Sequence, residues 1–280
     1  MARVGEVPDP GVIPLTPEER AARAASFGGA AAQYERYRQG PPAAAVDWIL
    51  PDPVGTVVDL GAGTGSLARL LVDRADEVIA VEPDDRMRAV LVESVPGVRA
   101  LAGRGESMPL PDASADAVLA SSSWHWMDPV PTLHEVGRVL VPGGTLAALW
   151  SGPDPESAFM AGAQALLGGG EASALDEQER GELDAALNDR SATVQALEIP
   201  TGVPFDQPEQ TVVTWDVALN ADELVGLLGT FSWVILMEDG DRTRLFETAR
   251  RLLRDALGIE GDVTVDVGYR AEVWRARRHR

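Results

Sequence analysis

The sequence predicts an α/β protein built on a doubly wound, mostly parallel sheet with helices on both faces. Three observations lead to this prediction. Apolar runs typical of buried strands alternate with helical patterns through the first half of the chain. A glycine turn, Gly61–Gly65, directly follows the first of these runs, and an acidic residue, Glu82, ends the second. Glycine turns after the first strand and acids after the second are typical of open α/β sheets.

The elements follow one another with recognisable start and stop signals. Pro51 and Pro53 end one early helix, and Asn220 is placed to cap a later one. The Pro142–Gly144 turn is expected to reverse the chain into a fifth strand. The expected strands are 56–60, 77–81, 98–102, 115–121, 146–150, 193–199 and 210–219, with a last strand or strand pair at 263–267 and 269–277. The expected helices are one after Thr16, then 31–39, 43–50, 66–73, one opening at Asp84, 129–140, 156–167, 171–189, 220–228 and 238–257.

The composition bounds the class of protein. The 280 residues are 45% apolar, enough for a core, and none is cysteine. Disulfides, thiolate metal sites and a cysteine nucleophile are therefore excluded, and we expect no metal. No run approaches the ~18 uncharged apolar residues of a membrane span, and no signal peptide is visible, so we expect a cytoplasmic protein without membrane contact. The net charge of −20, with one basic cluster at 275–280, argues against nucleic acid as a partner.

The glycine turn predicts a ligand held close to the main chain. Glycine permits positive φ and close approach of a ligand, and a helix expected to start at Ser66 would turn its first N–H groups toward that ligand. A dinucleotide fingerprint needs a third glycine at position 66, which is serine here, and a phosphate-binding P-loop needs a lysine that is absent. Asp59 stands two residues before the first glycine. The pattern thus differs from both common nucleotide motifs.

The run Val57–Gly65 resembles motif I of the class I S-adenosylmethionine-dependent methyltransferases, V-D-x-G-x-G-x-G. Residues 124–127, Trp-His-Trp-Met, are similar to a segment of trans-aconitate-type enzymes in the small-molecule branch of that family. Further segments resemble the family in the same order along the chain: 34–42 (Y-x-x-Y-R-P-x-x-P, with Gln39 for the first proline), 81–84 (V-E-P-D), 103–112 (G-D-A-E-x-L-P-F-x-D) and 135–146 (E-x-x-R-V-L-x-P-G-G-x-L).

The resemblance implies a Rossmann-like sheet of seven strands with an antiparallel last strand and a helical substrate cap. Together with the composition of the first residues, it leads us to expect four regions. Residues 1–30 form a mobile arm, and 31–150 form the S-adenosylmethionine-binding core with an N-terminal lid helix. Residues 151–192 form the cap insertion, and 193–280 complete the sheet and supply helices on the substrate side.

Candidate cofactor contacts lie in these segments. Glu82 offers two acceptors to a ribose diol, and Arg38 is suited to pair with the cofactor carboxylate. The family's adenine-binding Asp is Arg104 here, so the adenine contact is expected from the main chain near Gly105 and Glu106 or from another side chain. The full set of predicted cofactor contacts is Arg38, Asp59, Gly61, Ala62, Gly63, Gly65, Glu82, Pro83, Met87, Gly105, Glu106, Ser107 and Ser122.

The methyl acceptor is expected beside Tyr34, Trp124 and Trp126, with His125 as the candidate catalytic group. His125 is interpreted either as a general base or as a residue that packs or hydrogen-bonds the substrate. The tryptophans either form an apolar wall or stabilise the sulfonium by cation–π contact. The predicted activity is methyl transfer to a small molecule, carboxylates and specialised metabolites being favoured, by a monomer or homodimer. An NAD-dependent oxidoreductase and a non-catalytic S-adenosylmethionine-binding protein are the alternatives.

Overall fold

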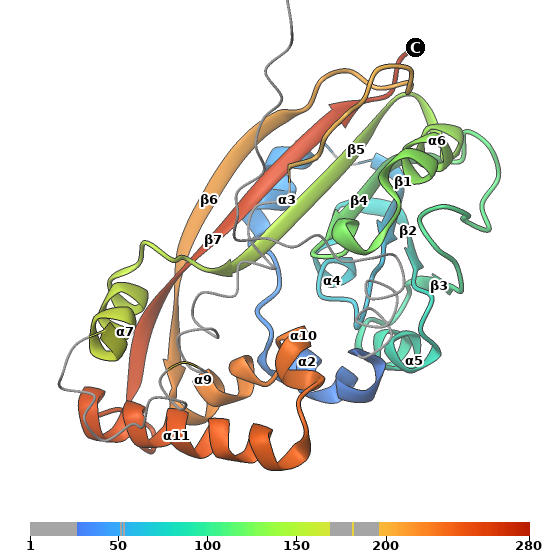
Figure 1. The fold of residues 1–280 in the computed structure, drawn as a ribbon. Helices are drawn as coiled ribbons and strands as arrows, with labels where there is room; N and C mark the ends of the chain where they lie inside the picture. Colours follow the sequence, from blue (N-terminus) through green and yellow to red (C-terminus); the bar gives the residue numbers. More distant parts are fainter. Residues whose placement is uncertain (1–26, 51, 53, 169–180, 182–195) are drawn as a thin grey trace, which may run out of the picture.

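A computed structural model describes residues 27–50, 52, 54–168, 181 and 196–280 of the chain (Figure 1). The arm over residues 1–26, the helix expected after Thr16 and nearly all of the helix expected at 171–189 lie outside the described residues.

The sheet has seven strands in the order β3-β2-β1-β4-β5-β7-β6. Strands β1 to β5 pair in parallel, whereas β7 is antiparallel to both β5 and β6, which confirms the predicted fold class. The strands are β1 (Val54–Leu60), β2 (Ala75–Val81), β3 (Arg99–Leu101), β4 (Ala115–Ser121), β5 (Leu140–Pro153), β6 (Glu209–Asn220) and β7 (Thr264–Arg277).

Helices cover both faces because the strand residues alternate between two cores. Val58 and its same-face neighbours pack with α6 (Pro129–Val139), while Val57 and its neighbours pack with α3 (Ala43–Ile49) and α4 (Ala68–Leu71). The other helical elements are η1 (Phe27–Ala30), α2 (Ala31–Tyr37), α5 (Asp85–Ser94), η2 (Trp124–Trp126), α7 (Ala158–Gly168), α9 (Ala221–Leu228), α10 (Ser232–Ile235) and α11 (Asp239–Leu257).

Local capping explains several helix ends. Asp84 caps α5 by accepting hydrogen bonds from the amides of Arg86 and Met87. Asn220 and Glu223 form a reciprocal capping box at the start of α9, where the sequence predicts one. Helix α11 ends at Gly258, whose φ of 67° lies in the left-handed region.

Several elements differ from the expectation. The helix expected from Ser66 begins only at Ala68, because the chain is still turning there, with the amide of Gly65 bonded to the carbonyl of Ala62. Residues 196–199 form no strand; Leu197 and Ile199 instead pack into the core as a covering segment. The expected strand pair at the C-terminus is the single strand β7, which runs through Gly268.

The fifth strand is longer than expected. Strand β5 includes the Pro142–Gly144 segment, which was expected to be a turn outside the strand. The register with β4 jumps from Ala115 opposite Leu140 to Ala117 opposite Thr145, so this segment is a bulge in β5 rather than a free turn.

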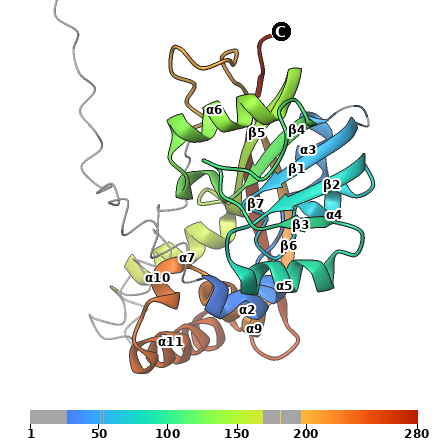
Figure 2. The ribbon, with the colours of Figure 1, turned by 90° about the vertical axis from the view of Figure 1, so that its right-hand side faces the viewer.

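Helices from both ends of the chain gather at one end of the sheet (Figures 1 and 2). Helix α2 contacts both α5 of the parallel core and α9 of the C-terminal half. A methyl group added at Gly226 of α9 would lie 2.5 Å from the ring of Tyr37 on α2, so a glycine is required for the two helices to meet this closely. No helix in the described part of the chain is both long and apolar enough to cross a membrane.

Candidate functional site

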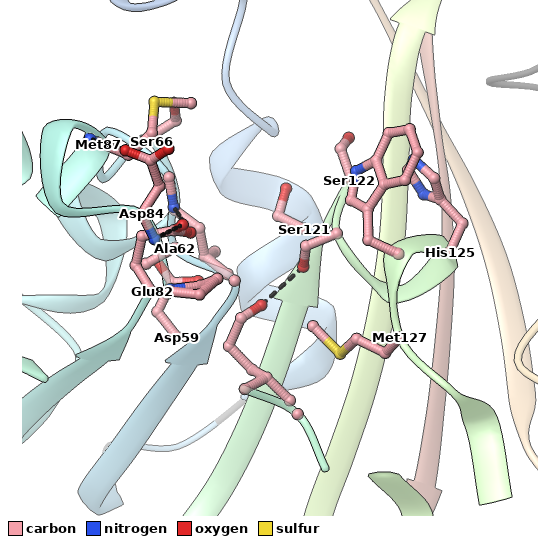
Figure 3. Close-up of a pocket in the computed structure, with 18 of the residues that line it drawn as sticks. Asp59, Ala62, Ser66, Glu82, Asp84, Met87, Ser121, Ser122, His125 and Met127 are labelled. Carbon is pink, nitrogen blue, oxygen red and sulfur yellow. Dashed lines mark hydrogen bonds between the residues drawn. The ribbon is translucent and has the colours of Figure 1, made fainter. Parts of the chain in front are cut away.

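A cavity of about 530 Å³ opens at the carboxyl ends of β1, β2 and β4. In open α/β sheets ligands bind at this edge, and the volume lies in the range of small-molecule and cofactor sites. Figure 3 shows Asp59, Glu82, Asp84 and Met87 on one side of this cavity and Ser122, His125 and Met127 on the other. We call the first group, with Gly61–Gly65, the acidic side, and we call His125, Trp126, Trp150 and Phe231 the aromatic side.

Each glycine of the turn meets a different physical demand. Gly61, Gly63 and Gly65 all have positive φ, at 68°, 57° and 94°. A methyl group added at Gly61 would lie 2.6 Å from Cβ of Ser123, and one at Gly65 would lie 2.9 Å from the side chain of Val95. Gly63 has open space around it, the nearest atom being 3.9 Å away, and it lines the cavity. Gly61 and Gly65 thus pack the turn into the protein, and Gly63 presents bare main chain to a ligand.

Glu82 ties the two loops of the acidic side together. Its Oε2 accepts a hydrogen bond from the Gly63 amide and its Oε1 accepts one from the Asp84 amide, both at 2.9 Å. The side chain is buried, and burial raises the pKa of Glu82 while these two amides partly offset the effect. Each carboxylate oxygen keeps a second lone pair, so the group can still accept from the hydroxyls of a ligand.

Asp59 lies beneath the glycine turn. Neither of its carboxylate oxygens has a hydrogen-bond partner among the described residues. Burial raises the pKa of Asp59 to about 7; the Ala68 amide lowers it in part, without meeting the geometry of a hydrogen bond, and the nearby Glu82 adds to the rise. A second carboxyl group therefore sits at this end of the cavity close to its ionisation point at neutral pH.

The loop after β3 is held by an ion pair on α6. The carboxylate of Glu135 accepts from the Met108 amide at 2.7 Å and pairs with Arg138, which also donates to the carbonyls of Met108 and Leu110. Arg138 lowers the pKa of Glu135. The E-x-x-R spacing noted in the sequence thus fixes the far end of the loop that carries Gly105 and Glu106 into the cavity.

The end of β4 has an unusual backbone. Ser122 has a φ of 50°, in the region that favours glycine, and it lines the cavity. Next to it the hydroxyl of Ser123, itself buried, donates to the carbonyl of Leu60 at 2.6 Å, which ties the end of β4 to the end of β1. Strained backbone held by its neighbours is common at functional sites.

The aromatic side is built from η2 and β5. His125 Nδ1 accepts a hydrogen bond from Trp150 Nε1 at 3.1 Å, and the ring of Trp126 lies 4.3 Å from the imidazole. All three residues line the cavity. The walls of this part are therefore largely aromatic, and a hydrogen bond joins two of the rings.

The lid helix α2 adds a positive charge. The guanidinium of Arg38, just after α2, lies 5.9 Å from the ring centre of Tyr34 and 5.4 Å from that of Phe231. No carboxylate in the described part of the chain forms an ion pair with Arg38, and all three residues line the cavity. An anionic group of a ligand would find a partner here.

Most of the predicted site residues line this one cavity. They are Tyr34, Arg38, Asp59, Gly61, Ala62, Gly63, Glu82, Pro83, Met87, Gly105, Glu106, Ser122, His125 and Trp126. Three predicted residues do not line it. Trp124 is buried in the main core, Gly65 packs against α5, and Ser107 exchanges main-chain hydrogen bonds with Arg104 in the loop turn. Their expected ligand contacts are therefore unsupported.

Several lining residues escaped the sequence analysis. Asp84 ends the quoted 81–84 segment without having been named as a contact, and Ser123 and Trp150 lie next to predicted contacts or motifs, but a strand tryptophan gives no signal of a polar role. Thr230 and Phe231 follow α9, more than 100 residues beyond the nearest motif residue of the aromatic side, Trp126. Only the packing of the C-terminal helices against α2 brings them to the cavity.

Known proteins match this arrangement. Residues 58–148 match a methyltransferase domain family. An uncharacterized methyltransferase of Mycobacterium tuberculosis (strain ATCC 25618 / H37Rv) is 36% identical over 228 residues, which cover 81% of this chain and 85% of that protein. An uncharacterized methyltransferase of Schizosaccharomyces pombe is 29% identical over 206 residues, or 72% of this chain and 76% of that one.

A solved structure from Anaeromyxobacter dehalogenans, described as a type II methyltransferase, shares the fold. It has a TM-score of 0.57 and 23% identity, and the alignment covers 86% of this chain and 98% of that one. The chain has six strands of common direction, a seventh strand antiparallel to them and a glycine turn after β1. The bacterial relative matches it over most of its length. These findings all indicate one family. This chain belongs to the class I S-adenosylmethionine-dependent methyltransferases.

Proposed function

We propose that this enzyme methylates a small organic molecule, a carboxylate or a related specialised metabolite being favoured. The observation that carries the proposal is the joining of the acidic and aromatic sides in one cavity of about 530 Å³. Such a volume accommodates a cofactor with a small acceptor beside it. The net charge of −20 disfavours a nucleic-acid acceptor.

The acidic side fits the cofactor in chemical terms. Glu82 would accept from the ribose diol with its remaining lone pairs, and the open main chain at Gly63 permits the nucleoside to approach. Met87 and the Gly105–Glu106 turn would border the adenine. Arg38, which lacks a carboxylate partner among the described residues, would bind the carboxylate of the methionine part. When bound, the cofactor supplies an activated methyl group on a sulfonium.

The aromatic side would receive the acceptor. Trp126 and Phe231 present apolar surface, and His125 contributes the polar atoms that orient a substrate. Methyl transfer needs the nucleophile held in line with the methyl group, so a wall of fixed shape is itself a catalytic contribution. The proposed similarity to trans-aconitate-type enzymes agrees with an acidic acceptor. We further propose a cytoplasmic monomer or homodimer.

The test is a methyl-transfer screen. Purified protein is incubated with methyl-labelled S-adenosylmethionine and with metabolite fractions separated into organic acids, phenols and alcohols, amines, and nucleic acids. Label is expected in the organic-acid fraction, with S-adenosylhomocysteine formed in equal amount. A Glu82→Ala variant serves as the control for background transfer. Label confined to the nucleic-acid fraction would refute the small-molecule proposal, and label confined to amines or phenols would refute the carboxylate class.

A further inference from the structure

The contact between His125 and Trp150 fixes which nitrogen of the imidazole carries the proton. An indole N–H is a donor only, so Nδ1 of His125, 3.1 Å from it, must present a lone pair. In a neutral imidazole one nitrogen is an acceptor and the other is a donor. The proton of neutral His125 therefore resides on Nε2.

Trp150 is not free to release this hydrogen bond. It lies on β5, which is paired with β4 on one side and with β7 on the other, and its side chain is only 5% exposed. Its ring meets that of Trp274 edge to face, with the centroids 5.3 Å apart at 82°. The donor is thus held in place by the sheet and by the packing of its ring, and the imidazole orients toward it.

A general base must offer a lone pair to the proton that it removes. The only lone pair of neutral His125 is committed to Trp150. A proton added at Nδ1 would also set two N–H donors against each other. This arrangement opposes the role of base that the sequence left open, and it favours the other alternative, a residue that hydrogen-bonds the substrate.

We infer that His125 acts as a hydrogen-bond donor through Nε2–H toward an oxygen of the methyl acceptor, with Trp150 as its positioning residue. A site without a histidine base suits an acceptor that is already ionised at neutral pH, which is the carboxylate class. One carboxylate oxygen forms the bond to the methyl carbon while the carbon–sulfur bond breaks and its electron pair goes to sulfur. His125 holds the other oxygen, and no proton is transferred. This inference rests on the proposed function for the identity of the acceptor.

The tautomer can be tested without cofactor or substrate, so its failure is separable from failure of the proposed function. The chain has three histidines, and the protein is labelled with ¹⁵N in their imidazoles. Long-range ¹H–¹⁵N spectra distinguish protonated from unprotonated ring nitrogens, and a His125→Gln sample identifies the signals that belong to residue 125. We expect Nδ1 unprotonated and Nε2 protonated. A protonated Nδ1, or a mixture of tautomers, in the wild-type protein would overturn the inference.

Two substitutions test whether the indole of Trp150 is what fixes the tautomer of His125. Trp150→Phe removes the indole donor and keeps an aromatic ring, and it should turn the single tautomer into a mixture. Trp126→Phe changes the other tryptophan beside His125 and should leave the tautomer unchanged. Circular dichroism and thermal unfolding establish that both variants fold. An unchanged tautomer in a folded Trp150→Phe variant would remove Trp150 from its assigned role.

The donor role is tested by kinetics on the acceptor found in the screen. Glutamine keeps an N–H donor but has no basic nitrogen, whereas alanine has neither. A hydrogen bond to a charged group supports an expected loss of about 10- to 100-fold in kcat/KM for His125→Ala, with His125→Gln within about tenfold of wild type. Trp150→Phe should have no further effect in the His125→Ala background. Equal losses in the Gln and Ala variants would restore the base, and no loss in either would remove His125 from the reaction.

Discussion

The two sides of the cavity are built in different ways. The acidic side comes from short segments at the ends of β1 and β2, and main-chain groups do much of the binding there: the amides of Gly63 and Asp84 hold Glu82, and positive φ angles shape the turn. The aromatic side is assembled from three separate segments, namely η2, β5 and the chain after α9. Its contacts are between side chains.

The difference explains how one scaffold can keep its cofactor and change its substrate. Main-chain geometry tolerates few sequences, because a side chain at Gly61 would collide with Ser123. Side-chain walls such as Trp126 and Phe231 can be exchanged with little effect on the sheet beneath them. Function that varies is therefore expected on the aromatic side, on loops carried by a fixed frame.

The largest expected effect is at Asp59, where the acidic side carries a destabilising charge. The folded-state pKa of about 7 lies above the ordinary value of 3.8. The neutral form of Asp59 therefore contributes stability that is fully present below pH 3.8 and is lost as the pH rises through 7. Asp59→Asn removes that loss. We expect the variant to be more stable than wild type at pH 8 by about 2 to 4 kcal/mol.

The measurement is denaturant unfolding of the cofactor-free proteins between about pH 3 and 8, roughly the interval over which the linkage acts. At the acid end the two proteins should be almost equally stable, since Asp59 is then neutral in both states. A difference that stays constant with pH would show that the pKa of Asp59 is the same in the folded and unfolded states. The acidic side would then hold no carboxyl group at residue 59 that titrates near neutral pH.

The glycine turn separates packing from ligand access. Gly61→Ala places a methyl group 2.6 Å from Ser123 at a positive φ, so strain and overpacking add, and we expect a loss of about 3 kcal/mol in stability. Gly63→Ala meets only open space and should cost about 1 kcal/mol of stability. Its main effect should be weaker binding of S-adenosylhomocysteine in isothermal titration. Equal stability losses in the two variants would contradict the distinct roles assigned to these glycines.

The two sides of the cavity also differ in how far the sequence alone predicts them. The fold and the acidic side were predictable because their determinants are local: strand periodicity, the spacing of Gly61–Gly65 and an acid at the end of β2. The capping box at Asn220 is of the same kind. Each of these signals lies within a few residues of the structure that it specifies.

The aromatic side was only partly predictable because its determinants are not local. The sequence placed His125 and Trp126 in the loop after β4 but gave no reason to pair His125 with Trp150, 25 residues away on another strand. Trp124 and Trp126 belong to the same short helix, η2, but Trp124 is buried in the core whereas Trp126 lines the cavity. Phe231 reaches the cavity only through the docking of α9 on the lid helix α2.

Arg38 lies between the acidic side and the aromatic side, and its substitution shows whether it binds the cofactor or the methyl acceptor. It stacks between Tyr34 and Phe231, yet its proposed partner is the cofactor carboxylate. Arg38→Gln should weaken binding of S-adenosylhomocysteine about tenfold, the value of a charge-assisted hydrogen bond near a partly open cavity. Arg36→Gln, two residues earlier in the last turn of α2, exposed and outside the cavity, is the matched control. Unchanged cofactor affinity with a raised KM for the acceptor would move Arg38 to the substrate.

The smallest expected effect is at the contact between α9 and the lid helix α2. Gly226 lies against the ring of Tyr37, and a methyl group there would come within 2.5 Å of it, so Gly226→Ala must push the lid helix away from α9. Alanine otherwise favours a helix by up to ~1 kcal/mol, which offsets part of the loss in global stability. The change should therefore appear as faster hydrogen exchange at the amides of α2, about tenfold, with little change in Tm.

Gly162→Ala on α7, where an added methyl group meets no atom within 4 Å, controls for the effect of alanine itself. The lid carries Tyr34 and Arg38, so a displaced α2 should also weaken cofactor binding slightly, in proportion to the exchange rate at its amides. If exchange in α2 were unchanged while cofactor binding weakened, α9 would act on the cavity through Thr230 and Phe231 alone. The aromatic side would then depend on the C-terminal helices without help from the lid.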